Sequence, residues 1–250
     1  MIRDITIGQY YPAKSVIHKL DPRTKLFGTL VFIISVFLFH SIAGYAVATV
    51  FLAGMILIST VPVKFIFKGL KAIFMILLIT MVFNIFLTPG EALVSFGIFK
   101  ITKEGLSMAV RMAIRLVYLV IGSSLMTLTT TPNQLTDGLE KSLRPLNKIH
   151  VPVHEIAMMM SIALRFIPIL LEETDKIQKV KNMVPLLVPL FISAFRRAND
   201  LAMAMEARCY HGGDNRTQMK PLKYKKRDHI AYLILFAYLA VAIGFRVAGL

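Results

Sequence analysis

The chain has 250 residues, of which 56% are apolar, whereas a soluble domain has roughly 45–50%. Because the excess is concentrated in blocks, the composition indicates an integral membrane protein. The formal net charge is +15, from 29 Lys and Arg against 14 Asp and Glu. Beside apolar blocks, this charge favours a lipid bilayer with an anionic inner leaflet as the partner, and no nucleic acid. The single cysteine, Cys209, excludes an internal disulfide.

Five apolar stretches approach the roughly 20 residues that a membrane-crossing helix needs. They are residues 26–39, 45–61, 70–87, 107–129 and 230–247. Between the third and the fourth, Ser95–Thr102 predicts a short extended excursion or hairpin, with Gly97 near its turn. The sequence therefore predicts an all-α integral membrane protein with about five transmembrane helices.

Lysine and arginine are unevenly distributed among the connections, and their distribution predicts the orientation. Lys14, Lys19, Arg23 and Lys25 precede the first span, and the turn after that span has neither residue type. The connection over residues 130–229 holds 16 of them. Since cytoplasmic loops carry the excess of Lys and Arg, we expect a multi-pass protein of the cell membrane with its N-terminus cytoplasmic and its C-terminus outside.

Few ionisable residues lie inside the predicted spans. Of the side chains of Asp, Glu, Lys, Arg and His, the first, second, third and fifth spans contain only Lys71, at the start of the third, and Arg246, near the end of the fifth. A proton or ion pathway normally needs more such groups at membrane depth. Arg111 and Arg115 lie in the outer third of the fourth span, one turn apart. Either they extend to the outer membrane interface, or they contact a partner inside the membrane.

Two apolar stretches in the connection over 130–229 are predicted to be helices at or just beneath the inner membrane surface. Residues 153–171 form a helix with a broad apolar face and a narrow polar stripe of His154, Ser161, Arg165 and Glu172. If this helix crossed the membrane, the lysines after it would lie outside, against the charge distribution. Residues 183–195 contain two prolines and are short for a span.

The apolar faces of these two helices must be covered by protein or lipid. Met158, Met159 and Met160 lie together on the first of them. Methionine is flexible and adapts to partners of different shape, but it also fills gaps inside a core. The organisation expected from these stretches is 1–129 for the N-terminal segment and four transmembrane helices, 130–229 for a cytoplasmic domain, and 230–250 for the last transmembrane helix.

No motif of a catalytic or metal site is present. None of the six histidines has the HExxH or another metal-ligand spacing, and the GxSxG, GxxxxGK[ST] and GxGxxG patterns are missing. The sequence therefore predicts neither an enzyme nor a cofactor in this chain.

A single arginine lies at the end of the last helix of the connection, in "LAMAMEARCYHGG" (Leu201–Gly213). This helix is predicted to run from about Leu186 to near Tyr210, with Gly212 and Gly213 able to supply a left-handed stop. Alanines make its end slim, so Arg208 projects from a narrow tip. Such a tip suits a groove lined with carboxylates or carbonyls, although a cation in a last turn also offsets the helix dipole.

Four long runs of the sequence resemble the T component of energy-coupling factor (ECF) transporters. They are "HKLDPRTKL", "TLTTTPNQLTDGLEKSLRPL", "PVHEIAMMMSIALRFIPILLEETDKI" and "PLLVPLFISAFRRANDLAMAMEARCYHGG". The resemblance implies a subunit of a prokaryotic importer of vitamins and other micronutrients. It implies two partner ABC-type ATPases, which bind ATP and Mg, and a small substrate-binding membrane S component. A membrane scaffold without energy coupling is the alternative.

The resemblance also implies the functional residues. Coupling helices of the family carry two Ala-Arg-Gly-type motifs that sit in grooves of the two ATPases. The later motif corresponds to Ala207, Arg208 and Cys209, with cysteine where glycine is often found. The S-component interface is expected at Met158, Met159, Met160, Ile162 and Leu164, whereas Arg165, Glu172 and Glu173 are expected to pair within the domain.

The earlier motif is where this sequence departs from the family pattern. An Ala-Arg-Gly motif is expected shortly after "EETDKI", but near Ile177–Lys181 the chain runs directly on as "QKVKNMVPLL". Either this arm is short, or residues are missing from the sequence at this point. The sequence does not identify the vitamin, because selectivity is expected to lie in the S component.

Overall fold

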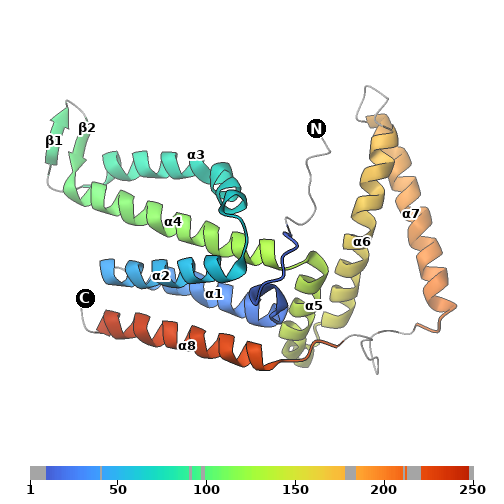
Figure 1. Cartoon of the computed structure of the whole chain (residues 1–250). Helices are drawn as coiled ribbons and strands as arrows, with labels where there is room; N and C mark the ends of the chain where they lie inside the picture. The colour runs from blue at the N-terminus through green and yellow to red at the C-terminus, as the bar shows by residue number, and fades with distance from the viewer. Residues whose placement is uncertain are drawn as a thin grey trace. The chain divides into compact units, whose positions relative to one another are not determined.

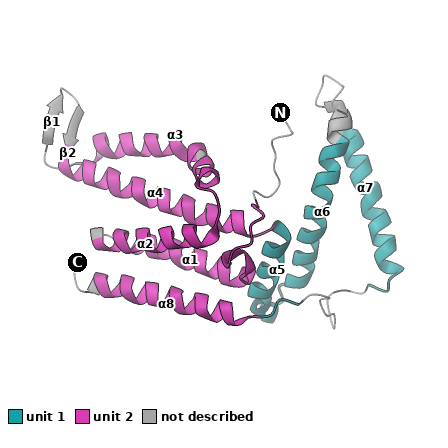
Figure 2. Ribbon diagram, in the orientation of Figure 1, with its two compact units in different colours: residues 1–9, 132–223 teal, residues 10–131, 224–250 magenta. Residues whose placement is uncertain are grey.

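The computed structural model describes residues 10–39, 41–89, 92–96, 99–177, 184–210, 212 and 221–247. Figure 1 shows the helices in chain order, and the chain divides into two compact units, coloured separately in Figure 2. We call residues 10–131 and 224–247 the bundle unit, and residues 132–223 the arm unit.

The bundle unit holds a long helix at each of the five predicted spans. These helices are α1 (Pro22–Leu38), α2 (Ile42–Ser59), α3 (Val63–Leu87), α4 (Lys103–Thr129) and α8 (Lys226–Val247). The third begins at Val63, seven positions before the predicted start, because lysine is a good helix former and the three lysines after Val63 do not break the helix. A bend of 56° separates its parts Val63–Lys71 and Ile73–Phe86.

Local side chains begin three of these helices. Asp21, Ser41 and Thr102 stand at the N-cap positions of α1, α2 and α4, and each accepts a hydrogen bond from a backbone N–H in the first turn. Asp21 is followed by Pro22 at the first helical position, where its fixed φ fits and its missing N–H costs no bond.

The core of the bundle unit lies between α1, α2 and α8. Its buried residues are Phe32, Val36, Phe39, Tyr45, Ala48, Leu52, Leu235, Tyr238 and Ala242. The rings of Phe51 and Tyr238 stack with their centroids 4.4 Å apart, and the Tyr238 hydroxyl is 2.7 Å from Ser35 Oγ. The buried hydroxyl of Tyr238 is therefore hydrogen-bonded within the apolar core.

A β-hairpin connects α3 and α4, as the sequence predicts. Strand β1 (Ala92–Phe96) pairs antiparallel with β2 (Phe99–Thr102), and Phe96 lies opposite Phe99. Gly97, the expected turn residue, lies outside the described residues. A Cβ at Gly105 would lie only 2.9 Å from the Asn84 carbonyl oxygen, so glycine allows α4 to begin this close to α3.

The helix ends show where the cations of the bundle unit gather. Figure 1 shows α1, α3 and α8 beginning, and α2 and α4 ending, at the end of the unit opposite the hairpin. Hydrogen bonds from Asp21 to Asp228 and from Lys25 to Thr129 join three of these helix ends. The basic residues that flank these helix ends therefore lie at the same end of the unit.

Several helices could cross a membrane by length and composition. They are α4, α8 and the segment Val153–Glu173, together with the two parts of α3 if these form one bent span. This confirms an all-helical membrane fold with a single small hairpin among the described residues. The number of helices that cross, and the surface position predicted for residues 153–171, stay predictions.

The arm unit consists of α5 (Pro132–Leu143), a 3-10 helix η3 (Arg144–Ile149), α6 (Val153–Ile177) and α7 (Val184–Glu206). His150 ends η3 in the left-handed conformation, with φ 60°, and α6 begins just after Pro152. His150 therefore lies just beyond the end of η3 and His154 lies in α6, so no continuous helix carries both, as the proline between them predicts.

Candidate functional site

The first candidate site is the tip of α7, which ends in a Schellman motif. The N–H of Tyr210 donates to the Met205 carbonyl at 3.0 Å, and the N–H of Cys209 donates to the Glu206 carbonyl at 2.8 Å. This pair of bonds satisfies carbonyls that the helix leaves without partners at its end. The turn over 207–209 is therefore held in one conformation by the backbone.

The left-handed residue of this motif is Cys209, with φ 54°. The sequence predicts that this helix ends near Tyr210, with Gly212 or Gly213 as the left-handed residue. The prediction of a glycine as the left-handed residue is wrong, because α7 ends at Glu206 and Cys209 already takes the left-handed conformation. Gly212 also has positive φ, at 106°, but it lies beyond the end of the motif. Glycine is the usual residue at such a position.

The side chains at this tip are open to solvent. Ala207, Arg208 and Cys209 are exposed, as are Ala202 and Ala204 one turn or more before them. Within the described residues, the Arg208 guanidinium has no hydrogen-bond or ion-pair partner. The structure therefore places a single planar cation on a slim and conformationally fixed helix end.

The residues expected to contact the S component differ in exposure on α6. Met159 and Met160 are exposed, by 59% and 40%, whereas Met158, Ile162 and Leu164 are half-buried. A more exposed apolar stripe lies on α7 and was missed by sequence reasoning. It comprises Val188, Phe191, Ile192 and Phe195, which are 57–68% exposed. Their i, i+3, i+4, i+7 spacing is the signal that could have identified them.

An ion pair joins the two long helices of the arm unit. Arg197 on α7 donates from Nη2 to Glu173 Oε2 on α6 at 3.0 Å, and Ser193 donates to the other carboxylate oxygen at 2.8 Å. Of the three residues expected to pair, only Glu173 has a partner; Arg165 and Glu172 are exposed and have none within the described residues. The Glu173 contacts hold α6 and α7 together.

The second candidate site is a buried polar cluster in the bundle unit, where α1 and α8 begin and α4 ends. We call Asp21, Lys25 and Asp228 the polar clamp. The Asp228 carboxylate, 2% exposed as a residue, accepts from the N–H of Asp21 and from the N–H of Lys225, both at 2.8 Å. It thus satisfies a backbone donor in front of each of two helices.

Lys25 completes the clamp by binding the end of α4. Its ammonium donates to the Thr129 carbonyl at 2.8 Å and lies 3.4 Å from the His18 carbonyl. Thr129 is the last residue of α4, and Asp228 lies in the first turn of α8. The chain passes between the two units just after Thr131 and just before Tyr224. The polar clamp therefore ties these two covalent connections between the units to the start of α1.

The segment before α1 is organised around His18. Its Nε2 lies 3.0 Å from the Tyr11 carbonyl, which can only accept, so this nitrogen carries the proton. Its Nδ1 then accepts from the Ser15 hydroxyl at 2.6 Å. Burial lowers the pKa of the His18 imidazole below its ordinary value, the bond to the Tyr11 carbonyl opposes this shift, and the Lys25 ammonium adds to it. The local structure therefore favours neutral His18.

The arginines of α4 find partners within the chain. Arg115 donates from Nη2 to the Phe39 carbonyl, at the C-cap of α1, at 3.2 Å, and lies 3.4 Å from the Tyr45 hydroxyl. Arg111 is exposed and donates to Ser107 Oγ at 3.3 Å. Arg115 thus makes a polar contact with α1, and neither arginine requires a separate protein partner to explain its position.

Neither candidate site resembles a metal or catalytic centre. Within the ranges that the structure describes, no group of three or more His, Cys, Asp or Glu could hold a metal ion. The groups present suit electrostatic anchoring at the α7 tip and mechanical connection at the polar clamp.

Comparison with known proteins identifies the family. The family model CbiQ, described as cobalt transport protein, matches residues 13–219. Several relatives are named energy-coupling factor transporter transmembrane protein EcfT. The one from Clostridium kluyveri is 53% identical over 266 residues, and the alignment covers 99% of this chain and 98% of that relative. The relative from Ruminiclostridium cellulolyticum is 51% identical, over 91% of this chain and 92% of its own length. The relative from Bacillus subtilis is 45% identical, over 96% of this chain and 98% of its own length.

The C. kluyveri alignment is longer than the 250 residues of this chain, so that relative has residues without a counterpart here. The match otherwise extends over nearly the full length of both proteins. The chain belongs to the family of transmembrane T components of energy-coupling factor transporters.

Proposed function

We propose that this chain couples ATP hydrolysis by two cytoplasmic ABC-type ATPases to vitamin or micronutrient uptake through a substrate-binding S component. The observation that carries the proposal is the α7 tip. Arg208 is exposed and unpaired within the described residues, and the Schellman motif that encloses it, over residues 205–210, fixes its backbone. A guanidinium presented in this way can form charge-assisted hydrogen bonds in a groove lined with carboxylates or carbonyls.

The arm unit would carry motion from the ATPases. Glu173 and Arg197 hold α6 and α7 together, so a displacement of the α7 tip is passed to both helices. The chain then enters the bundle unit at two places, and the polar clamp joins both to α1. Motion of the ATPases would in this way reach the membrane helices and an attached S component, while ATP and Mg are bound by the ATPases alone.

The apolar surface of the arm unit supports docking of the S component. Met159 and Met160 on α6 are exposed, and so is the stripe on α7 that begins at Val188. An exposed apolar surface marks an interaction site, and methionine adapts to partners of different shape. A T component with such a surface could serve more than one S component.

The orientation follows from the end of the bundle unit that gathers cations. Lys19 and Arg23 lie where α1 begins, Lys64 where α3 begins, and Lys226 and Arg227 where α8 begins. Because Lys and Arg are retained on the cytoplasmic side, this end faces the cytoplasm. The N-terminus is then cytoplasmic, and the C-terminus lies outside.

The earlier Ala-Arg-Gly motif is expected near Ile177–Lys181, and residues 178–183 lie outside the described residues. The proposal of two ATPase contacts rests on that motif, and the contact through Arg208 does not.

Arg208→Glu tests the ATPase contact. The tagged chain is purified from cells that produce the other transporter subunits, and the ATPases that accompany it are quantified. Arg208→Glu should lose the ATPases and ATP-driven uptake, while the variant still inserts into the membrane. Arg196→Glu makes the same charge change at another exposed position on α7 and should retain both.

Normal uptake by Arg208→Glu would refute the anchoring role. The alternative, a scaffold without energy coupling, predicts that ATPases and S component co-purify although uptake proceeds without ATP hydrolysis. Uptake measured with a non-hydrolysable ATP analogue inside membrane vesicles separates the two functions.

A further inference from the structure

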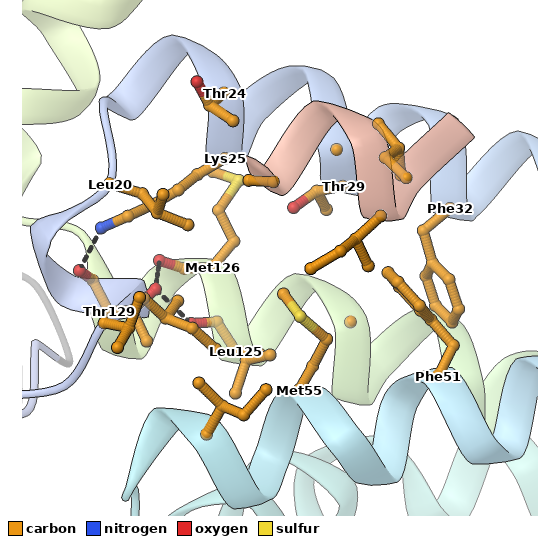
Figure 3. Close-up of a pocket in the computed structure, with 18 of the residues that line it drawn as sticks. Leu20, Thr24, Lys25, Thr29, Phe32, Phe51, Met55, Leu125, Met126 and Thr129 are labelled. Atoms are coloured by element: carbon orange, nitrogen blue, oxygen red, sulfur yellow. Dashed lines mark hydrogen bonds between the residues drawn. The ribbon is translucent and has the colours of Figure 1, made fainter. Parts of the chain in front are cut away.

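The bundle unit contains a cavity of about 180 Å³ among α1, α2, α4 and α8. Figure 3 shows side chains that line it, among them Phe32, Phe51, Met55 and Met126. The walls are mainly apolar, and the volume exceeds the roughly 150 Å³ of an apolar cavity that can bind benzene. The cavity can therefore hold part of a hydrocarbon chain.

One face of α8 combines a cation with an apolar surface along this cavity. Arg227, Ile230, Ala231, Ile234 and Leu235 line it at i, i+3, i+4, i+7 and i+8, which places them on one side of the helix. Arg227 is exposed, and its guanidinium has no partner within the described part of the chain. An amphiphile lying along α8 would meet the cation at the helix start and hydrocarbon over the next two turns.

The wall that α1 contributes leaves room for a ligand. A Cβ at Gly28 on α1 would meet no atom within 4 Å, because the missing side chain faces open space. At the far end, Phe51 stacks on Tyr238 and lies 5.9 Å from Phe32, centroid to centroid. The rings of Phe32 and Phe51 therefore form the wall at the end of the cavity away from Lys25.

The rim of the cavity faces the lipid. Ile58 on α2 and Ile230 and Ile234 on α8 line the cavity and are also 50%, 58% and 47% exposed. All three belong to stretches predicted to lie in the bilayer, so hydrocarbon rather than water surrounds them. An acyl chain of the bilayer can therefore reach the cavity without leaving the hydrocarbon layer.

Lys25 is not available for a head group, although it lines the cavity. Figure 3 shows its ammonium directed to the Thr129 carbonyl, to which it donates at 2.8 Å. Its methylene groups contribute apolar wall, as lysine stems commonly do. Arg227 is thus the cavity-lining cation with a free guanidinium among the described residues.

We propose that this cavity binds one acyl chain of an anionic phospholipid of the cytoplasmic leaflet, with the lipid phosphate beside Arg227. The phosphate complements the planar guanidinium, and the cation-rich end of the bundle unit attracts anionic lipid to the site. The proposal does not depend on the ATPase or S-component contacts, since all its residues belong to the bundle unit.

The chain has no tryptophan, which allows a single fluorescent reporter. Phe51→Trp, which replaces one aromatic ring of the cavity wall with another, serves as the pocket reporter. Phe236→Trp, 61% exposed on α8 and outside the cavity lining, serves as the surface reporter. The purified full chain is reconstituted in phosphatidylcholine vesicles. Brominated-chain phosphatidylglycerol or brominated-chain phosphatidylcholine is then added as the quencher.

The fluorescence of the pocket reporter should be half-quenched at a fraction of brominated phosphatidylglycerol about fivefold lower than the fraction of brominated phosphatidylcholine that is needed. This factor corresponds to the attraction of one cation for an anionic lipid. The surface reporter should respond equally to both lipids. Arg227→Gln should abolish the difference between the two lipids in quenching the pocket reporter. Gly28→Leu should also abolish it, because the leucine side chain fills the cavity, whereas Gly28→Ala should keep it. If Gly28→Leu does not fold, Ala231→Leu fills the cavity from α8.

Equal quenching of the pocket reporter by the two lipids would overturn the proposal. So would a preference that persists in Arg227→Gln, since the cation would then have no part in it. A preference retained by a folded cavity-filling variant would show that the lipid binds at the surface only, and this result also contradicts the proposal.

Discussion

Replacing Asp228 by alanine tests whether the polar clamp holds the bundle unit together. The carboxylate accepts two backbone N–H groups at 2.8 Å. A hydrogen bond to a charged group contributes about 1.5–3 kcal/mol. The Asp21 N–H stays buried when its acceptor is removed, whereas water can reach Lys225, which is exposed. We therefore expect Asp228→Ala to lower the free energy of unfolding by about 3–5 kcal/mol.

The purified chain is unfolded in mixed micelles by raising the fraction of a denaturing detergent, and unfolding is monitored by far-UV circular dichroism. Asp228→Asn keeps one acceptor oxygen and should lose about half as much. Asp200→Ala removes an exposed carboxylate that has no partner within the described residues, and its effect should stay within about 0.5 kcal/mol. If Asp228→Ala destabilises the chain no more than Asp200→Ala, the clamp does not stabilise the bundle.

Three further predictions concern the α7 tip, the membrane topology and pH. Cys209→Gly should stabilise the chain by about 1 kcal/mol, because a residue with a Cβ is strained at φ 54°, whereas Cys209→Val should destabilise it; thermal unfolding measures both. In the Cys209→Gly background, Lys179→Cys should react with a membrane-impermeant maleimide only in inside-out vesicles, and reaction in right-side-out vesicles would show that α6 crosses the membrane. Because the pKa of His18 is lower in the folded chain than in the unfolded one, the stability it contributes is complete above the unfolded pKa of about 6.5 and is lost as the pH falls towards the folded pKa. His18→Gln should reduce the loss of thermal stability between pH 7.5 and 5.5, and an unchanged pH dependence would contradict this assignment.

The elements of the bundle unit could be predicted because each has a local signal. Long apolar runs predict α1, α2, α4 and α8, and the Gly-containing stretch around residue 97 predicts the hairpin. The start of α3 was missed because lysines were taken as loop residues, although lysine forms helices well and can extend its ammonium to the membrane surface.

The candidate sites could be predicted only in part. The residues Ala207, Arg208 and Cys209 came from resemblance, but the left-handed stop was assigned to glycines because cysteine rarely adopts positive φ. The polar clamp could not be predicted, since Asp21 and Asp228 are 207 positions apart and Lys25 and Thr129 are 104 apart. No local pattern relates residues at such separations, and only the packing of α1 against α4 and α8 brings them together.

The helices of the bundle unit differ greatly in length, and this difference has a consequence for the bilayer in the topology that the sequence predicts. With 17 and 18 residues, α1 and α2 extend about 26 Å at a rise of 1.5 Å per residue, whereas the 27 residues of α4 extend about 40 Å. In the topology predicted from the sequence, these helices all cross a hydrocarbon layer about 30 Å thick. Lipids beside α1 and α2 would then have to compress, while α4 would have to tilt or extend beyond them. In that topology, a neighbouring membrane protein beside α1 and α2 would meet a thinned bilayer, and by tilting it would expose less of its apolar surface to water.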